Sequence, residues 1–376
     1  MNETTTSRIK KKPFLFGAIV KPPHFADRKQ ELKDITSDLA SGQHIIMYSP
    51  KRYGKTSLIL KVLKNMEQDY LTAYIDLFEI TSKQKFVEKY INCVVPKGKI
   101  EEVAEILKKY IPGILPKITL GENASIVFEA PKIEKTIDEV LDLPQKIAKK
   151  KRKRMIVVFD EFQEIKRLGT EDMENIMRSK FQHHDMVSYV FLGSKRHMFD
   201  EIFKDRNRPF FKFGKQIVLD KLPKDEFHTY IKERFKATGK KIDDTHIDKI
   251  LNITNCHPYY TQQLAHEIWN LSNLSVDEKD IENSIENVLR DQSYAYELIW
   301  DSIGNYSRSL LLGIATENNN IYSMPFITKY NLNSATNVQK ALQILKKKEL
   351  IEIKEEKYYI EDVFFGQWLK KRMSTA

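Results

Sequence analysis

The residues of this chain best suited to chemistry are Gly54, Lys55 and Thr56, which stand between two apolar runs. The run 44–48 precedes them and predicts a strand, and the run 58–63 follows them and predicts a helix. The order strand, tight loop, helix leaves backbone N–H groups open at the start of the helix, where they bind anions. A lysine and a hydroxyl at this point add a positive charge and a metal ligand. These residues therefore predict a site for a phosphate chain.

The surrounding loop matches the P-loop pattern G-x-x-x-x-G-K-[ST], also called Walker A, except at its first position. Ser49 replaces the first glycine, and a small residue serves there if its φ need not be positive. We expect Lys55 to reach the β- and γ-phosphates of ATP and the Thr56 hydroxyl to bind Mg²⁺. The alternative is a chance Gly-Lys-Thr turn, which the flanking strand and helix patterns disfavour. The predicted nucleotide-binding loop consists of Ser49, Pro50, Lys51, Arg52, Tyr53, Gly54, Lys55, Thr56 and Ser57.

A second candidate group of residues, resembling a Walker B motif, lies about a hundred residues further on. The apolar run 155–159 predicts a strand that is buried on both faces, and Asp160 and Glu161 end it. Open α/β sheets bind ligands at the carboxyl ends of their strands. Asp160 suits a Mg²⁺ ion that keeps part of its water, and Glu161 suits deprotonation of an attacking water. The alternative is a solvated turn, which the buried strand disfavours.

Composition indicates an ordinary globular protein of two or three domains. The 376 residues are 41% hydrophobic and 30% charged, and no apolar run approaches the length of a membrane span. Residues 1–12 are polar and then basic, unlike a secretory signal. With only Cys93 and Cys256, we expect a cytoplasmic protein with neither a disulfide framework nor a zinc site.

The net charge of +10 permits contact with nucleic acid without requiring it. The densest basic run, 149–154, lacks interleaved aromatic residues. We interpret it as the end of a helix, where cations interact well with the helix dipole, in preference to a nucleic-acid patch.

The chain-wide pattern predicts an α/β fold followed by helices. Strands at 71–76, 155–159, 186–192 and 216–219 alternate with helices, which is typical of a parallel sheet, and residues 117–128 predict an inserted hairpin. From residue 224 the pattern is helical, and it ends in a small hairpin like that of a winged helix. We predict a disordered segment 1–13, a core 14–222 with an insertion at 81–132, a helical lid 223–290 and a winged-helix domain 291–376.

Together these features resemble the archaeal-type P-loop ATPases, relatives of the AAA+ and STAND ATPases. The resemblance covers nearly the whole chain and implies an AAA+-like ATPase core, a helical lid and a C-terminal winged helix. It rests on Phe25, Arg28 and Glu31, on the Lys-Arg-x-Gly-Lys-Thr-Ser loop, on the box 160–163, on Gly193 and Ser194, and on the run 257–260.

The resemblance also implies further nucleotide contacts. Phe25 and Arg28 match a segment that lies against the adenine, with core packing as the alternative for Phe25. Ser194 matches the catalytic sensor-1 position near the γ-phosphate, with a helix cap as the alternative. His257 and Pro258 match a lid motif that comes near the nucleotide, and a structural role at a helix start is the alternative for His257.

Two features of such ATPases are not assigned from the sequence. No sensor-2 arginine is evident. Arg206 and Arg208 lie where an arginine finger would be expected, but solvated loop arginines are the alternative. A finger acts on a neighbouring subunit, so a homo-oligomer stays open.

We predict an enzyme that hydrolyses ATP to ADP and phosphate with Mg²⁺ and acts as a conformational switch. Lys55, Glu161 and Ser194 are the predicted catalytic residues, and Thr56 and Asp160 the metal ligands. The alternative is a slow or non-hydrolysing ATP-binding scaffold or DNA-binding regulator. The winged helix would contact double-stranded DNA or a protein client through residues 335–348, which carry Asn337, Lys340, Gln343, Lys346 and Lys347.

Overall fold

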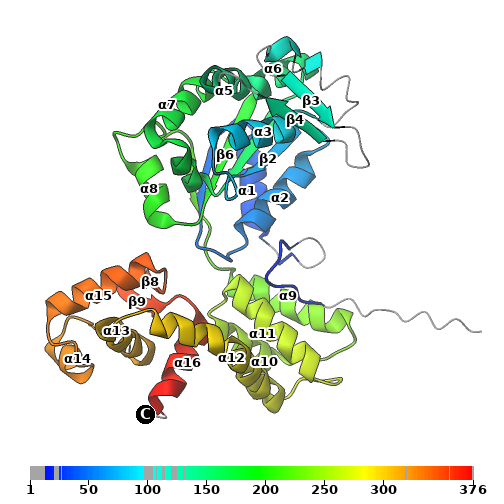
Figure 1. The fold of residues 1–376 in the computed structure, drawn as a ribbon. Helices are drawn as coiled ribbons and strands as arrows, with labels where there is room; N and C mark the ends of the chain where they lie inside the picture. Colours follow the sequence, from blue (N-terminus) through cyan, green and yellow to red (C-terminus); the bar gives the residue numbers. More distant parts are fainter. Residues whose placement is uncertain are drawn as a thin grey trace, which may run out of the picture. The chain divides into compact units, whose positions relative to one another are not determined.

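The chain forms two compact units (Figure 1). The sheet unit is Ile19–Lys221, and the helical unit is Met1–Ala18 with Leu222–Ala376. Apart from Pro13, the segment predicted to be disordered lies outside the described residues. The computed structural model describes residues 13–20, 25–26, 28–96, 105–106, 108–111, 115–119, 125–129, 133–317, 320–354 and 356–374.

The sheet unit is built on five parallel strands in the order β2-β5-β6-β1-β7. This arrangement, with helices on both faces, confirms the predicted α/β class. Two strands, β5 and β6, separate β2 from the strand that leads into the phosphate loop. The bounds are Ile45–Tyr48 for β1, Leu71–Asp76 for β2, Met155–Asp160 for β5, Val187–Gly193 for β6 and Lys215–Val218 for β7.

Burial of the strands follows their place in the sheet. Every residue of β5 and β6 is buried, as expected for central strands that helices cover on both faces. The side chains alternate: Ile156 and Val158 pack on one core, and Val157 and Phe159 on the other. Both cores depend on this register, because a shift of one residue would exchange the two faces.

Helices cover each face of the sheet. On one face, α1 (Lys29–Ala40) and α2 (Lys55–Met66) bury residues such as Leu39 and Val62. The other face carries a larger, aromatic core. The elements around that core are α3 (Lys83–Val94), α5 (Ile133–Leu141), α6 (Leu143–Lys151), the 3-10 helix η1 (Phe162–Leu168), α7 (Thr170–Phe181) and α8 (Arg196–Lys204).

The predicted insertion contains a hairpin. Strands β3 (Leu115–Thr119) and β4 (Ser125–Glu129) pair antiparallel, as the sequence pattern predicts, and their turn lies outside the described residues.

The helical unit contains helices and one further hairpin. α12 runs without a break from Glu278 to Asp301, twelve residues beyond the predicted helix end at Leu289, since the intervening residues include neither glycine nor proline. The predicted boundary at 290/291 therefore falls inside one helix. The remaining elements are α9 (Lys224–Ala237), α10 (Asp244–Thr254), α11 (Pro258–Leu271), α13 (Asn305–Thr316), α14 (Met324–Lys329), α15 (Ala335–Lys347), β8 (Ile351–Lys354), β9 (Lys357–Ile360) and α16 (Val363–Ser374).

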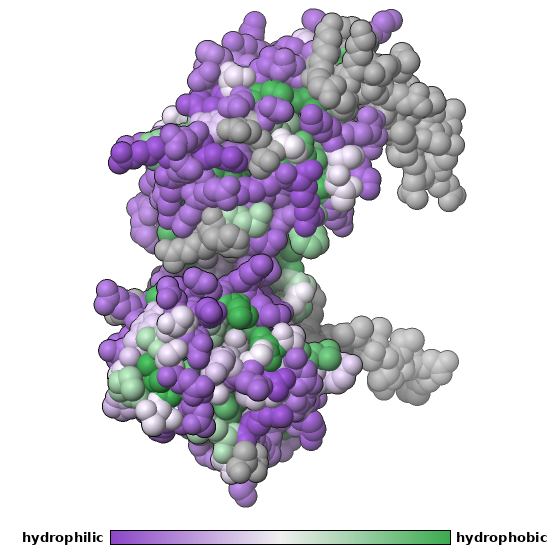
Figure 2. Space-filling model, turned by 60° about the vertical axis from the view of Figure 1, so that its left-hand side comes forward, coloured by the Kyte–Doolittle hydropathy of each residue, from purple (hydrophilic) through white to green (hydrophobic). Residues whose placement is uncertain are grey.

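Figure 2 shows one face on which hydrophilic residues predominate and hydrophobic areas are small. Across the described part of the chain, no helix is both long and apolar enough to span a bilayer.

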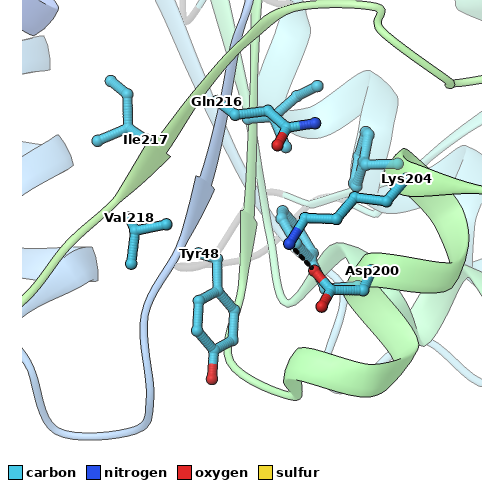
Figure 3. Close-up of a pocket in the computed structure, with 9 residues that line it drawn as sticks. Tyr48, Asp200, Lys204, Gln216, Ile217 and Val218 are labelled. Atoms are coloured by element: carbon cyan, nitrogen blue, oxygen red, sulfur yellow. Dashed lines mark ion pairs between the residues drawn. The ribbon is translucent and has the colours of Figure 1, made fainter. Parts of the chain in front are cut away.

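A hollow lies beside the edge strand β7, which follows β1 at one end of the strand order. Figure 3 shows the labelled Tyr48, Gln216 and Val218 around it, with the ion pair between Asp200 and Lys204 (2.8 Å) at its rim. Its described lining contains none of the predicted site residues.

His44 lies directly before β1, at the amino end of that strand. Its ring stacks on Phe213 with centroids 4.6 Å apart, and its Nδ1 accepts a hydrogen bond from the backbone N–H of Tyr189 (3.2 Å). Burial, together with the nearby cations of Arg178 and Arg154, lowers the pKa of His44 from 6.5 to about 4. The native fold therefore holds this imidazole neutral.

We expect the stability of the sheet unit to fall as the pH is lowered from about 6.5 to about 4. In that window the unfolded chain binds a proton at His44 that the native state does not bind, so the free energy of unfolding decreases. His44→Asn keeps an acceptor for the backbone N–H but does not titrate, and should flatten the slope measured by urea denaturation at several pH values. The control His183→Asn, at an exposed site, should keep the wild-type slope; equal slopes for both variants would contradict this account.

Candidate active site

The loop between β1 and α2 is shaped by its backbone. Gly54 has φ +87°, a left-handed conformation that glycine adopts without strain, and its carbonyl accepts the N–H of Leu58 as the helix begins. Gly54 contributes no capping side chain, and the first turn of α2 carries no acidic residue. The open N–H groups and the positive end of the helix dipole therefore favour an anion at this point.

Ser49, at the position of the missing glycine, is fully buried. Its φ is not positive, which explains why the loop does not need glycine there. Its backbone N–H donates to the carbonyl of Gly193 at the end of β6 (3.2 Å). This bond joins the start of the loop to the strand that precedes Ser194.

Arg28 holds the other end of the loop. Its guanidinium is buried and donates to the backbone carbonyls of Tyr53 (3.1 Å) and Asp220 (2.7 Å), and it pairs with Glu31 (2.8 Å). Phe25 is partly buried against the α1–α2 core, in agreement with the packing alternative. The adenine contacts predicted for Phe25 and Arg28 stay predictions.

Lys55 lies between the two carboxylates that end β5. Its Nζ is 2.9 Å from Asp160 Oδ1 and 3.2 Å from Glu161 Oε1, although the two segments are more than a hundred residues apart. Lys55 is buried, with 6% of its side chain exposed, because the side chain extends toward the carboxyl end of β5 and not into solvent. The structure thus brings together the phosphate loop and the acidic pair that the sequence predicts.

Asp160 receives further hydrogen bonds on its second oxygen. The hydroxyls of Thr56 (2.7 Å) and Tyr74 (2.6 Å) both donate to Oδ2. Burial alone would raise the pKa of Asp160, but the Lys55 charge and these hydrogen bonds outweigh it and hold that pKa below its ordinary value. Asp160 is therefore a buried, ionised carboxylate.

Tyr74 and Asp76, at the end of β2, are functional neighbours that the sequence analysis missed. Asp76 is the register partner of Asp160 in the adjacent strand. Burial, with the nearby charges of Asp160 and Glu161, raises the pKa of Asp76, and burial with the Asp160 charge raises the pKa of Tyr74. A tyrosine two residues before a terminal aspartate, on the same face of a strand, is a weak signal that could have indicated them.

Glu161 is held in a left-handed backbone conformation, φ +52°, directly after the strand. Its Oε2 accepts hydrogen bonds from the hydroxyl of Ser194 (2.7 Å) and from the amide of Gln163. Ser194 therefore joins Lys55, Thr56 and Asp160 in one cluster. Gln163 belongs to the predicted acidic box, but its own role was not foreseen.

Arg206 and Arg208 differ in their surroundings. Arg206 is exposed, whereas Arg208 forms an ion pair (2.5 Å) with Glu174, which is fully buried. Burial raises the pKa of Glu174 against the opposing effect of Arg208. The side chain of Arg208 thus compensates the charge of a buried carboxylate within the sheet unit.

His257 and Pro258 lie in the helical unit, where they begin α11. The His257 ring is buried, and its Nδ1 accepts the backbone N–H of Tyr259 (3.2 Å), which caps the helix. Pro258 occupies the first helical turn, where its missing N–H costs nothing. This geometry agrees with the structural alternative, and the nucleotide contacts of both residues stay predictions.

Two regions of the chain match known protein families. Residues 25–264 match a family described as an ATPase domain predominantly from Archaea, and residues 294–371 match a family described as a probable winged helix domain. The first match spans more than half of the chain. The protein belongs to this archaeal-type ATPase family. Its C-terminal domain is a winged helix, as the resemblance implied.

Solved structures show the same fold at low sequence identity. A Walker-type ATPase of Pyrococcus abyssi superposes with a TM-score of 0.68 at 15% identity, over 93% of this chain and 97% of that one. The ORC2 protein of Aeropyrum pernix, in ADPNP–ADP complexes, gives 0.59 at 14% identity, over 97% and 98%. The ORC1 protein of Aeropyrum pernix, in complex with DNA, gives 0.50 at 13%, over 93% and 94%. No curated protein matches the sequence of this ATPase.

We expect Arg28→Met to destabilise the sheet unit by about 3 kcal/mol, because the backbone carbonyls of Tyr53 and Asp220 and the carboxylate of Glu31 lose a charged donor. The loop should also bind ATP less tightly, since one of its ends is released. Urea denaturation and calorimetric titration with ATP measure the two effects. Arg206→Met, at an exposed site, is the matched control; equal stability of the two variants would show that Arg28 does not hold the loop.

Proposed function

We propose that this ATPase binds ATP with Mg²⁺ and hydrolyses it to ADP and phosphate. The observation that carries the proposal is the cluster at the carboxyl edge of the sheet. There Lys55 bridges Asp160 and Glu161, while Thr56 and Ser194 donate to the same two carboxylates. These are the groups that phosphoryl transfer to water requires: an anion site, metal ligands and a base.

In the proposed complex the loop residues 49–57 surround the phosphate chain. The backbone N–H groups of the first turn of α2 donate to phosphate oxygens, and Lys55 exchanges its carboxylate partners for the β- and γ-phosphates. Because this exchange replaces one set of anionic partners with another, the buried ammonium stays compensated throughout.

Thr56 and Asp160 would hold Mg²⁺. The hydroxyl and carboxylate oxygens lie 2.7 Å apart, and both are hard oxygen donors of the kind that Mg²⁺ prefers. The low pKa of Asp160 keeps the carboxylate ionised for this purpose. Within the described residues no group of three or more histidine, cysteine or acidic side chains is arranged to hold a metal. When bound, the ion would neutralise charge on the phosphates, to which Mg²⁺ normally binds alongside one or two carboxylates.

Glu161 would act as the general base. Its carboxylate accepts a proton from a water molecule as the water oxygen attacks the γ-phosphorus, and the bond from phosphorus to the β–γ bridging oxygen breaks. The ADP oxygen takes the electron pair of that bond. Ser194, through its hydrogen bond to Oε2, orients the carboxylate for this step.

The presence of an ATPase domain and a winged helix in one chain supports a conformational switch driven by hydrolysis. The sheet unit ends at Lys221, one residue after the backbone carbonyl that Arg28 binds. A change in the phosphate loop could thus be transmitted through Tyr53 and Arg28 to Asp220, at the junction. We propose that this activity takes place in the cytoplasm, where the thiols of Cys93 and Cys256 would stay reduced.

A second candidate is a DNA-binding regulator that hydrolyses ATP slowly or not at all. The observation that favours it is the exposed face of α15, on which Lys340, Lys346 and Lys347 all reach solvent. Asn337 is less available, because its amide donates to the carbonyl of Leu332. Lysines contact phosphates more readily than base edges, so the proposed partner is double-stranded DNA of any sequence, with a protein client or a second copy of the chain as rivals.

Glu161→Gln should bind ATP with Mg²⁺ normally and hydrolyse it about 10²- to 10⁴-fold more slowly, since an amide cannot take up the proton. Phosphate release and calorimetry measure rate and affinity separately. The control Lys55→Met, which keeps the stem and loses the charge, should fail in binding itself. Turnover of Glu161→Gln within a few-fold of wild type would remove Glu161 from the role of base.

For the second candidate, we expect the full-length protein to bind duplex DNA with an affinity that falls steeply as salt increases. Replacing Lys340, Lys346 and Lys347 together with alanine should lower the salt slope by about three, one for each phosphate contact, and weaken binding equally on unrelated sequences. Lys279→Ala, at an exposed site on α12, is the control. Anisotropy of a labelled duplex at two salt concentrations measures this, and absence of binding at low salt would end the DNA hypothesis.

A further inference from the structure

The two oxygens of the Glu161 carboxylate have different partners. Oε1 faces the Lys55 ammonium at 3.2 Å, whereas Oε2 accepts from both Ser194 and Gln163. In the proposed reaction Lys55 turns to the phosphates, which would release Oε1 and leave Oε2 held. This difference makes Oε1 the oxygen that can accept a proton.

The amide group of Gln163 is directed at the Glu161 carboxylate. Its side chain is fully buried, its Nε2 donates to Glu161, and its own Oε1 has no hydrogen-bond partner among the described residues. Burying an unpartnered carbonyl costs free energy. The Gln163 amide therefore donates to the carboxylate of Glu161 while its own carbonyl oxygen is left without a hydrogen bond from any described residue.

The segment that carries Gln163 is held in place by the aromatic core. Gln163 is the second residue of η1, directly after Phe162, whose ring is fully buried. The Phe162 ring lies 4.6 Å from that of Phe191 in β6 and 5.6 Å from that of Phe203 in α8, measured between centroids. This packing fixes the start of η1, and with it the direction of the Gln163 side chain.

A second tie joins η1 to the loop that carries Ser194. Lys195, the next residue, pairs through Nζ with Glu164 Oε1 at 2.9 Å, and Glu164 is buried with 3% of its side chain exposed. The two hydrogen-bond donors of Glu161 Oε2 thus lie on segments that a partly buried ion pair holds together. Their distance from one another is set before any ligand arrives.

We propose that Gln163 is a positioning residue, which together with Ser194 holds Glu161 Oε2 so that Oε1 faces the attacking water. This inference rests on the proposed function, because it assigns an orientation to the base of that reaction. In this role Gln163 would contact Glu161 but neither the phosphates nor the water.

The first test is Gln163→Met, which keeps the length of the side chain and removes its donor. The rate constant kcat should fall about 10- to 100-fold, as expected when a base is misplaced by a fraction of an ångström to an ångström, while the Kd for ATP with Mg²⁺ stays within two- to three-fold. Gln163→Asn, which shortens the amide by one methylene and retains its polarity, should show the same split and provides a second variant if methionine disturbs folding.

The matched control is Gln145→Met. Gln145 is also buried in the sheet unit, and its amide also donates to a carboxylate, that of Asp185. Loss of a buried amide in general would therefore affect both variants alike. A similar fall in kcat for Gln145→Met, or wild-type kcat for both Gln163 variants, would overturn the proposal.

The decisive test is the double variant Glu161→Gln with Gln163→Met. If Gln163 acts through Glu161, the double variant should be no slower than Glu161→Gln alone, whereas independent or purely structural effects would multiply. Multiplying effects would refute the positioning role and leave the proposed function intact. Near-wild-type turnover of Glu161→Gln alone would instead remove Glu161 from the role of base and refute the positioning role of Gln163, whereas absence of hydrolysis by the wild-type protein would refute the proposed function.

Discussion

The ion pair of Lys55 with Asp160 is the interaction on which the rest of the site depends. Asp160 is almost completely buried at the edge of the sheet, and a buried carboxylate is stable in its ionised form only beside a compensating charge or several donors. Lys55 supplies that charge at 2.9 Å, and Thr56, the next residue in the same turn of α2, supplies a hydroxyl. The requirement couples the phosphate loop to the end of β5 even before a nucleotide is considered.

This coupling constrains the sheet. The loop that carries Lys55 leaves β1, the acidic pair leaves β5, and β6 lies between these two strands. All three strands must therefore end at one level, and the register achieves this by pairing Tyr48 with Gly193 and Phe159 with Phe191. The stacked rings of Phe159 and Phe191, 5.6 Å apart, stabilise this register, because a slip of either strand by one residue would turn its ring to the opposite face of the sheet. Packing in the aromatic core thus helps to position the polar residues at the carboxyl ends of these strands.

The same constraint explains why the cluster consists of charges that satisfy one another. Lys55, Asp160, Glu161 and Ser194 share hydrogen bonds in the structure, so none of them is buried at full desolvation cost. Such a network is preorganised for a phosphate chain, which offers Lys55 new anionic partners. In the proposed function, binding then changes the partners of Glu161, and the arrangement of η1 and the Ser194 loop decides which of its oxygens becomes available.

Much of this protein could be predicted from local patterns. The P-loop residues, the strand that ends in Asp160 and Glu161, the alternation of strands and helices and the C-terminal winged helix all have short-range signals: glycine and lysine at fixed spacing, continuous apolar runs and a terminal hairpin. The extension of α12 beyond Leu289 was not predicted, because the polar residues that follow Leu289 are compatible with either the end or the continuation of a helix, although no glycine or proline interrupts it.

The types and spacing of the residues are enough to indicate which side chains can do phosphate chemistry and which elements carry them. The partners of these side chains depend on how the chain folds. Arg28 serves as a clamp on Tyr53 and Asp220, and Tyr74 donates to Asp160, across strands that no local pattern aligns. These contacts depend on strand order and register, which arise from the packing of segments a hundred or more residues apart, and a side chain's hydrogen bonds are known only once that packing has placed its neighbours.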